Sequence, residues 1–432
     1  PMEGHQILMG ANAVAEGLHA GAKSDIAARD RGTPDEQPHA STAPSGRGRS
    51  VESSGDTTSD TATQTIPIAD ALWVKISSST LDNSKANMVN SINNQLCDEP
   101  SGRSRAPHAR EGLTMQSVSH LAVSRFTFGC TPEADLVFTS PFIGNTLRGA
   151  LGMALRRMNC VMPHDTPCTA CTQCATCAYA VLFEPRLGLR SPLTGTAAVH
   201  GHDVPRPFVI QPPDHTVRRY PAGATFTFGL TIFGEQASYL PYFIAAFRRL
   251  GKIGFGPDRI TYRLQSVTDH TGGTVYSDDH TTVRQPAPPV VHPVSLNGAH
   301  PHAITVRFVT PTRIKVGGRY QDTPQFSYIV LAAERRIRAL QQFYDPRHYN
   351  NQPLTELHRL ADAVRLTHAR TRWVDLERIS RRQHTAMQLG GIVGEATYAG
   401  EQLHRFLPLL RLAEVTHLGK NCAFGLGRVE VV

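Results

Sequence analysis

The sequence has no apolar run that reaches the ~18 residues of a membrane-spanning helix. Its first residues also lack the basic-then-apolar pattern of a secretory signal. We therefore expect a cytoplasmic protein with no membrane partner. Acidic residues are comparatively few, with 36 Asp and Glu against 44 Lys and Arg, which leaves a formal net charge of +8. This excess favours a polyanionic partner such as nucleic acid.

Large apolar residues are scarce in residues 1–114, which are rich in Ser, Thr, Gly, Ala, Asp and Pro. Such a composition buries too little apolar surface to offset the entropy lost on ordering. We predict that residues 1–114 are a disordered low-complexity extension. The short apolar patch at 66–76 is compatible with a local helix or strand. The composition changes abruptly at Met115, where we place the start of the folded part.

Apolar periodicity predicts an N-terminal domain over residues 115–270. Alternation at 121–129 is typical of a strand, and the spacing of Ile143, Leu147, Leu151 and Leu155 is that of a helix over 143–158. The further predicted elements are strands at 207–211, 224–233 and 259–267 and a helix at 237–250. The order β-α-β-β-α-β is that of a ferredoxin-like unit.

The same order is predicted to repeat in a C-terminal domain over residues 301–432, after a Pro-, Gly-, His- and Thr-rich linker at 271–300. The predicted elements are strands at 303–309, 370–379 and 390–398, helices at 326–344 and 403–415, and a last strand at the carboxyl end. The fold class is therefore predicted as α+β, with two tandem ferredoxin-like (RRM-like) domains.

Cysteine is sparse overall, but five of the eight fall between Cys160 and Cys177. In a cytoplasmic protein such clustering favours a metal site over disulfides. A structural zinc takes four thiolates and replaces a core that a short loop cannot build. We expect the ligands to be Cys160, Cys168, Cys171 and Cys177, because Cys160 ends the predicted helix and Cys177 begins the return of the chain.

Other readings of this cysteine insert remain open. Cys174 is spare in the preferred set, but it replaces Cys160 in a compact alternative set that approaches the spacing of iron–sulfur proteins. His164 is a possible substitute ligand, and the segment without a metal is a further alternative. Any metal here is expected to be structural, because no nearby carboxylate or His group indicates an open catalytic position.

Three glycines lie near the carboxyl end, in the segment 417–428, which we call the glycine loop. A glycine-rich turn between a helix and a strand is able to point several N–H groups at an anion. Cations beside those groups favour a phosphate-bearing polymer. The residues concerned are Gly419, Gly425, Gly427, Lys420 and Arg428. The alternative is a tight helix-to-strand turn with no ligand.

Several stretches, taken together, resemble the RAMP superfamily of CRISPR systems. The resemblance is to the repeat-processing endoribonucleases that cut precursor CRISPR RNA, in the branch with a cysteine-bearing insert, and it covers residues 118–432. The matching stretches are Leu147-Arg-Gly-Ala-Leu-Gly, Cys177-Ala-Tyr-Ala-Val-Leu-Phe-Glu-Pro, Arg206-Pro-Phe-Val-Ile, Tyr239-Leu-Pro-Tyr-Phe-Ile, Arg372-Trp-Val-Asp-Leu, Gly390-Gly-Ile-Val-Gly and His417-Leu-Gly-Lys.

The resemblance implies metal-independent cleavage of a repeat RNA, with no cofactor for catalysis. The 2′-hydroxyl attacks the adjacent phosphate and leaves a 2′,3′-cyclic phosphate, and the product is mature guide RNA. Precursor CRISPR RNA and other CRISPR effector subunits are the implied partners. Many relatives carry a histidine in or just after the first helix, but residues 143–158 contain none. A non-catalytic RNA-binding subunit of the same superfamily is the alternative, and an iron–sulfur redox protein is a third.

The cleavage reaction needs a base, an acid and cations around the phosphate. We predict His417, Lys420 and Arg148 as catalytic residues, although His417 also fits a histidine that only satisfies the carbonyls at a helix end. The predicted RNA-binding residues are Lys420, Arg428, Gly419, Gly425, Gly427, Arg378, Arg381, Arg382 and His384. Charge runs of this kind are also common on solvated faces. Tyr398 and Phe424 either stack on a base or pack in the core.

Overall fold

The structure is a computed structural model, and it describes residues 63–68, 72–77, 120–140, 142–163, 166–185, 204–214, 216–256, 258–279, 282–292, 301–380 and 385–432. These residues form antiparallel β-sheets and α-helices, so the predicted α+β class is confirmed. Most of the predicted extension 1–114 lies outside the described residues, as do His164, Arg381, Arg382 and His384. Within that extension, β1 (Thr63–Ile68) pairs antiparallel with β2 (Leu72–Ser77).

The N-terminal half, residues 120–292, contains a sheet of strand order β5-β7-β3-β8-β9, with β10 also paired to β3. The two helices that pack on it are α2 (Ile143–Asn159) and α4 (Leu240–Ile253). The strands are β3 (Leu121–Pro132), β5 (Phe208–Gln211), β7 (Phe226–Phe233), β8 (Tyr262–Asp269), β9 (Thr274–Ser277) and β10 (Val290–His292).

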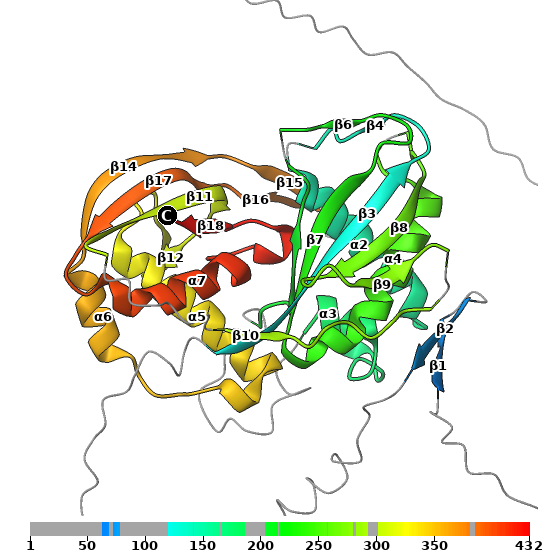
Figure 1. Cartoon of the computed structure of the whole chain (residues 1–432), viewed down its shortest axis with the longest axis horizontal. Helices are drawn as coiled ribbons and strands as arrows, with labels where there is room; N and C mark the ends of the chain where they lie inside the picture. The colour runs from blue at the N-terminus through cyan, green and yellow to red at the C-terminus, as the bar shows by residue number, and fades with distance from the viewer. Residues whose placement is uncertain are drawn as a thin grey trace, which may run out of the picture. The chain divides into compact units, whose positions relative to one another are not determined.

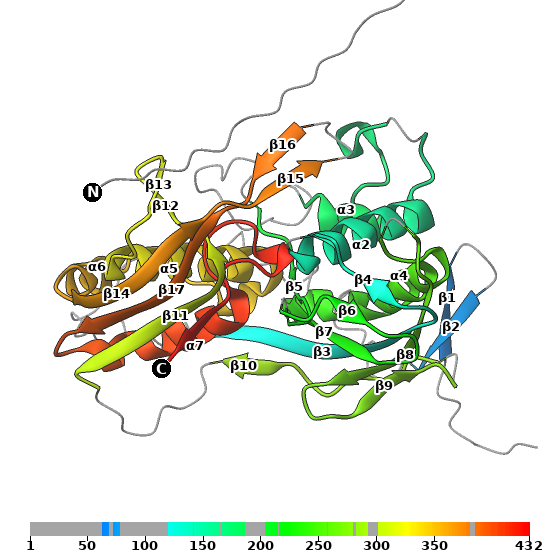
Figure 2. The same cartoon turned by 90° about the horizontal axis from the view of Figure 1, so that it is seen from above.

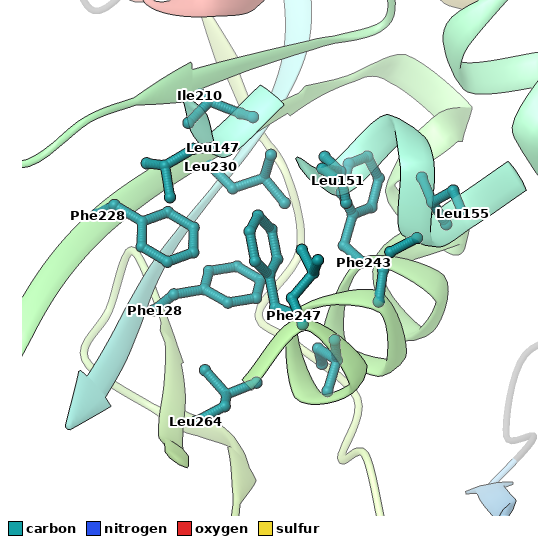
Figure 3. Packing of buried hydrophobic residues seen from close by; sticks show 14 of the residues in the cluster. Phe128, Leu147, Leu151, Leu155, Ile210, Phe228, Leu230, Phe243, Phe247 and Leu264 are labelled. Carbon is teal, nitrogen blue, oxygen red and sulfur yellow. The ribbon is translucent and has the colours of Figure 1, made fainter. Parts of the chain in front are cut away.

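The core of this half forms where the apolar faces of sheet and helices meet (Figure 3). Phe128 of β3 stacks on Phe228 of β7, with ring centroids 5.0 Å apart. Phe247 of α4 packs against both rings, at 5.3 Å and 4.7 Å. Leu147 and Leu151 of α2 are fully buried in the same cluster. The helical spacing that predicted α2 is therefore the spacing of its buried face.

The C-terminal half, residues 301–432, contains a second sheet of order β14-β17-β11-β18. Helices α5 (Phe326–Tyr344) and α7 (Leu407–Thr416) lie along one side of it (Figures 1 and 2). The strands are β11 (Ala303–Thr312), β14 (Arg365–Val374), β17 (Gly391–Ala399) and β18 (Val429–Val431). The first four strands of each half thus follow the same order, with an equivalent helix after the first and the third strand.

Shorter elements connect these parts. The helices among them are α3 (Ala178–Phe183) and α6 (Thr355–Asp362). Three small antiparallel pairs are β4 (Leu136–Val137) with β6 (Arg219–Tyr220), β12 (Lys315–Val316) with β13 (Arg319–Tyr320), and β15 (Glu377–Ser380) with β16 (Thr385–Gln388). None of the described helices is both long and apolar enough to cross a membrane.

Two predicted boundaries need correction. The segment 271–300 is not a plain linker, because β9 pairs with β8 and β10 pairs with β3 inside it. Its Pro- and Thr-rich composition hid two strands of only three or four residues. The strand predicted at 370–379 runs from Arg365 to Val374, and a separate strand, β15, begins at Glu377.

Residues from both halves share one apolar cluster. Leu121 and Val123 of β3 and Phe233 of β7 are buried together with residues of α5 and α7. The backbone N–H of Ala122 donates to the Asp345 carboxylate over 2.7 Å, and both residues are buried. The two halves are therefore packed against each other through a buried, largely apolar interface.

Candidate functional site

The glycine loop lies against the N-terminal half. A Cβ on Gly425 would meet the carbonyl oxygen of Ile210 in β5 at 2.4 Å, and a Cβ on Gly144 of α2 would meet the Phe424 carbonyl oxygen at 2.0 Å. The φ angles of Gly419, Gly425 and Gly427 are +78°, +87° and +74°. Glycine is required at these positions because a side chain would be strained there, and one at Gly425 or Gly144 would also push the two halves apart.

The predicted role of these glycines as phosphate ligands is not supported, because their amides are mostly used within the chain. Gly425 N–H donates to the Cys422 carbonyl over 2.8 Å, and Gly427 N–H donates to the Pro311 carbonyl over 3.1 Å. The Cβ position of Gly419 lies only 2.3 Å from the Arg313 carbonyl oxygen. The loop is the tight helix-to-strand turn of the alternative interpretation, and its glycines permit close backbone packing.

His417 is completely buried and does not reach the surface. Its ring Nδ1 lies 3.0 Å from the Leu426 carbonyl oxygen, and its φ of +62° places it in the left-handed region. Burial lowers the pKa of His417 to about 3, and the positive charges of Arg336 and Arg428 act in the same direction. The prediction of His417 as a catalytic residue is therefore wrong in this geometry, because an enclosed neutral imidazole cannot exchange a proton with a bound polymer.

The two cations of the loop are on the surface. Lys420 and Arg428 are exposed, and Arg428 Nη2 is 2.9 Å from Glu430 Oε1. Exposed ion pairs of this kind contribute little to stability, so Arg428 is able to exchange its partner for a phosphate at small cost. Phosphate contact by both residues stays a prediction.

Arg148 lies between two aromatic rings from different parts of the chain. Its guanidinium carbon is 4.2 Å from the Phe424 ring centroid and 5.0 Å from that of Phe183. The guanidinium of Arg378 lies 5.0 Å from the same Phe424 ring. We call these four residues the Arg–Phe stack. It joins α2, α3, the glycine loop and β15, and contacts of this type favour a cation over a ring face.

A third guanidinium lies close to the Arg–Phe stack. Arg206 Nε donates to the Phe183 carbonyl over 3.2 Å. Burial lowers the pKa of Arg148 to about 9, and the positive charges of Arg206 and Arg378 act in the same direction. Arg148 therefore stays protonated at neutral pH while it is 9% exposed and close to two like charges.

Three positive charges meet in this cluster, and the Glu184 carboxylate and Tyr179 act on the pKa of Arg148 in the opposite direction. Over the described ranges, the Nε of Arg148 has no hydrogen-bond partner, and none of the three guanidiniums forms an ion pair with a carboxylate. A buried unpaired charge is costly. Planar guanidinium groups match the geometry of phosphate oxygens. The cluster is therefore chemically suited to an anion such as a backbone phosphate.

The other predicted contacts divide into three cases. Arg378 joins the Arg–Phe stack from β15, in a hairpin that extends toward α2 (Figures 1 and 2). Arg381, Arg382 and His384 follow it in sequence and lie outside the described residues. Tyr398 is fully buried, and its hydroxyl donates to the Pro324 carbonyl over 2.6 Å, so it packs in the core.

The five insert cysteines line a single pocket, which extends from Asn159 to Ala180. None of the five forms a disulfide within the described part of the chain, and Cys168 is buried. Within the described residues no three His, Cys, Asp or Glu side chains are arranged to hold a metal ion. The expected zinc set of Cys160, Cys168, Cys171 and Cys177 is therefore not gathered around one point in this structure.

Sequence reasoning assigned no role to Phe183 or Arg206. Both lie in stretches that carried the resemblance, Cys177-Ala-Tyr-Ala-Val-Leu-Phe and Arg206-Pro-Phe-Val-Ile. The resemblance identifies these stretches, but it does not show which side chains contact one another. Only the packing of α3 against α2 brings Phe183 to Arg148.

Two protein-family models match this chain, one in each half. Residues 306–429 match the family model of the CRISPR-associated endoribonuclease Cas6. Residues 121–288 match a second model, the AF_1859_N family, described as an N-terminal domain. The C-terminal half therefore matches a CRISPR-associated endoribonuclease family, and the resemblance stated from the sequence is confirmed.

Among individual proteins, an uncharacterized protein of Archaeoglobus fulgidus is 24% identical over 295 residues, covering 66% of this chain and 90% of that protein. Cas6 of Thermus thermophilus (TTHB231) is 16% identical with a TM-score of 0.41, covering 72% of this chain and 99% of that one. The structure titled "An RAMP protein binding different RNA substrates" is 10% identical with a TM-score of 0.36, covering 72% of this chain and 99% of that chain.

Proposed function

We propose that this protein binds CRISPR repeat RNA between two ferredoxin-like halves and cleaves precursor CRISPR RNA to give mature guide RNA. One observation carries the proposal: Arg378 of the Cas6-family domain meets Arg148 and Arg206 of the N-terminal half around Phe183 and Phe424. A single phosphate placed among them would relieve the electrostatic cost of keeping three guanidiniums together.

The proposed reaction is metal-independent transesterification. The 2′-oxygen of the ribose attacks the adjacent phosphorus as its proton leaves, and the bond from phosphorus to the 5′-oxygen breaks as that oxygen gains a proton. The products are a 2′,3′-cyclic phosphate and a 5′-hydroxyl. Negative charge grows on the phosphoryl oxygens in the transition state, where fixed cations have their largest effect. No cofactor takes part in this scheme.

The arginines have distinct roles in the proposal. Arg148, held between two rings and largely shielded from water, stabilises the charge at the reacting phosphate. Arg378 holds the same phosphate from the C-terminal half. The exposed Lys420 and Arg428, and with them Arg381, Arg382 and His384, contact neighbouring phosphates and fix the register of the strand.

The test uses the full chain with the repeat RNA of its own locus, labelled at the 5′ end, in buffer with EDTA. We expect one cut whose 5′ fragment ends in a cyclic phosphate. An RNA with a 2′-deoxy nucleotide at the scissile position should bind but stay intact, because the nucleophile is missing. Cleavage of that deoxy RNA, or cleavage only when a divalent metal is added, would overturn the mechanism.

The alternative is a non-catalytic RNA-binding subunit that works with other CRISPR effector subunits. The burial of His417 favours this alternative, because the histidine predicted as a base cannot reach RNA. Helix α2 contains no histidine that could replace it. The same experiment separates the two functions. Tight binding of the repeat with no product, at enzyme in excess and long incubation, supports the binding subunit.

A further inference from the structure

The pocket at the carboxyl end of α2 is lined mostly by the cysteine insert, residues 160–177. All five cysteines of the segment line it, together with neighbours such as Asn159 and Tyr179. We propose that this pocket holds one Zn²⁺, ligated by Cys160, Cys168, Cys171 and Cys177, and that the metal positions the Arg–Phe stack through α3. The metal site is independent of the proposed function. Only the predicted effect of the metal on RNA binding rests on that function.

The fold brings the two ends of the insert together. Cys160 is the residue that ends α2, with its N–H donating to the Arg156 carbonyl over 2.8 Å, and Cys177 is the residue that begins α3. The sulfur of Cys177 lies 3.9 Å from the carbonyl oxygen of Asn159, directly before Cys160. Two thiols at fixed helix ends therefore border one pocket without any further folding.

The middle of the insert supplies the remaining ligands from tight turns. Cys168 begins a 3-10 turn, and the N–H of Cys171 donates back to the Cys168 carbonyl over 3.4 Å. A Cys-x2-Cys turn of this kind brings two sulfurs to one side of the backbone, as zinc sites require. Metal binding would require these sulfurs to turn toward one point, and it would release the thiol protons.

The described part of the insert has little apolar packing of its own. Cys168 is the only one of its described side chains that is buried, and no disulfide links the described cysteines. A segment of this length with no apolar core does not hold one conformation by packing alone. A metal cross-link between four thiolates supplies the missing constraint.

The metal would act on the functional site through α3. This short helix begins at Ala178, directly after Cys177, and ends at Phe183, whose ring contacts the Arg148 guanidinium and whose carbonyl accepts from Arg206. Tyr179 stacks on Phe183 with ring centroids 5.6 Å apart. Fixing Cys177 therefore fixes the ring and the carbonyl that hold two of the three arginines.

The first test measures metal directly. The full chain, purified without a metal-affinity tag, is analysed by elemental mass spectrometry, and we expect about one zinc per chain and a colourless protein. Replacement by Co²⁺ should give the absorption of a tetrahedral tetrathiolate. A chain without stoichiometric metal, or a brown chain with iron and sulfide, would overturn the proposal.

Two cysteine variants form a matched pair. Cys168→Ser should lose zinc, whereas Cys174→Ser should keep it, because Cys174 lines the same pocket but is not one of the proposed ligands. Loss of zinc in Cys174→Ser with retention in Cys160→Ser would overturn the ligand assignment in favour of the compact set.

The effect on RNA is measured separately, by repeat binding of Cys168→Ser and Cys174→Ser at equal concentrations of folded protein. We expect about 10-fold weaker binding for Cys168→Ser, within the range found when the shell that orients a site is removed. Unchanged binding by a zinc-free, folded Cys168→Ser would overturn the link through α3. Zinc in a chain that binds no RNA would refute the proposed function and leave the metal site standing.

Discussion

The guanidinium of Arg148 lies 4.2 Å from the ring centroid of Phe424, although Arg148 belongs to α2 of the N-terminal half and Phe424 to the glycine loop at the carboxyl end. The contact is possible because Gly144, one helical turn before Arg148, lets the Phe424 carbonyl approach α2. The cationic cluster therefore exists only when the two halves are docked.

Replacing Arg148 by Met should reduce the rate of repeat cleavage by about 100-fold, the size expected when one charged donor to a transition state is lost. Met fills a similar volume and removes a buried charge, so the fold should persist. The measurement is single-turnover cleavage with enzyme in excess. Arg157→Met, on the exposed side of the same helix, is the control and should cleave normally. Normal cleavage by Arg148→Met would remove this arginine from the site.

Gly144→Ala and Gly149→Ala, both in α2, should change the free energy of unfolding in opposite directions. A Cβ at position 144 would lie 2.0 Å from the Phe424 carbonyl, whereas nothing lies within 4 Å of one at position 149. We expect Gly144→Ala to lower the free energy of unfolding by about 2 kcal/mol through overpacking. Gly149→Ala should raise it by up to about 1 kcal/mol, because Ala is the better helix former. Urea denaturation of both variants tests this, and equal stabilities would contradict the close contact.

Stability should depend on pH through His417. Burial lowers the pKa of the folded-state imidazole to about 3, while the unfolded imidazole titrates near its ordinary value of about 6.5. Between these values the unfolded chain binds a proton that the folded chain does not. The contribution of His417 is therefore fully present above pH ~6.5 and is lost progressively as the pH falls toward 3.

Replacing His417 by Asn, which tolerates the left-handed backbone there, should flatten that dependence between pH 7 and pH 5. The measurement is denaturant unfolding at several pH values, with the exposed His302 replaced by Gln as the control. Cleavage at pH 7 by folded His417→Asn should stay within a few-fold of the original chain. A loss of about 100-fold or more would return His417 to the role of general base.

Lys420→Ala and Arg428→Ala should each weaken repeat binding and reduce its salt dependence. For single-stranded nucleic acid, each lost phosphate contact lowers the slope of log affinity against log salt by about 0.7. Filter binding over a range of salt concentrations measures that slope. Arg359→Ala is the control, because Arg359 is exposed on α6 and paired with Glu356 at 2.9 Å. If all three variants show the same slope, the glycine-loop cations do not contact the backbone.

Much of the element order is readable from the sequence. Leu147 and Leu151 recur at helical spacing because they form the buried face of α2, and Phe126 and Phe128 alternate because they face the core from β3. The short strands β9 and β10 were missed because three or four residues carry too little periodicity to separate from a loop. The glycines are visible in the sequence as special backbone positions, but only the packing of the loop shows which backbone each one approaches.

The sequence by itself determined the α+β class, most of the strand and helix order, the clustering of five thiols and the positive charge. Each of these depends on neighbours along the chain or on composition. Tertiary packing alone decided that His417 is enclosed and neutral, and that Arg148, Arg206 and Arg378 meet around Phe183 and Phe424. Burial and charge proximity depend on which elements from the two halves pack together, and that information is not contained in local spacing.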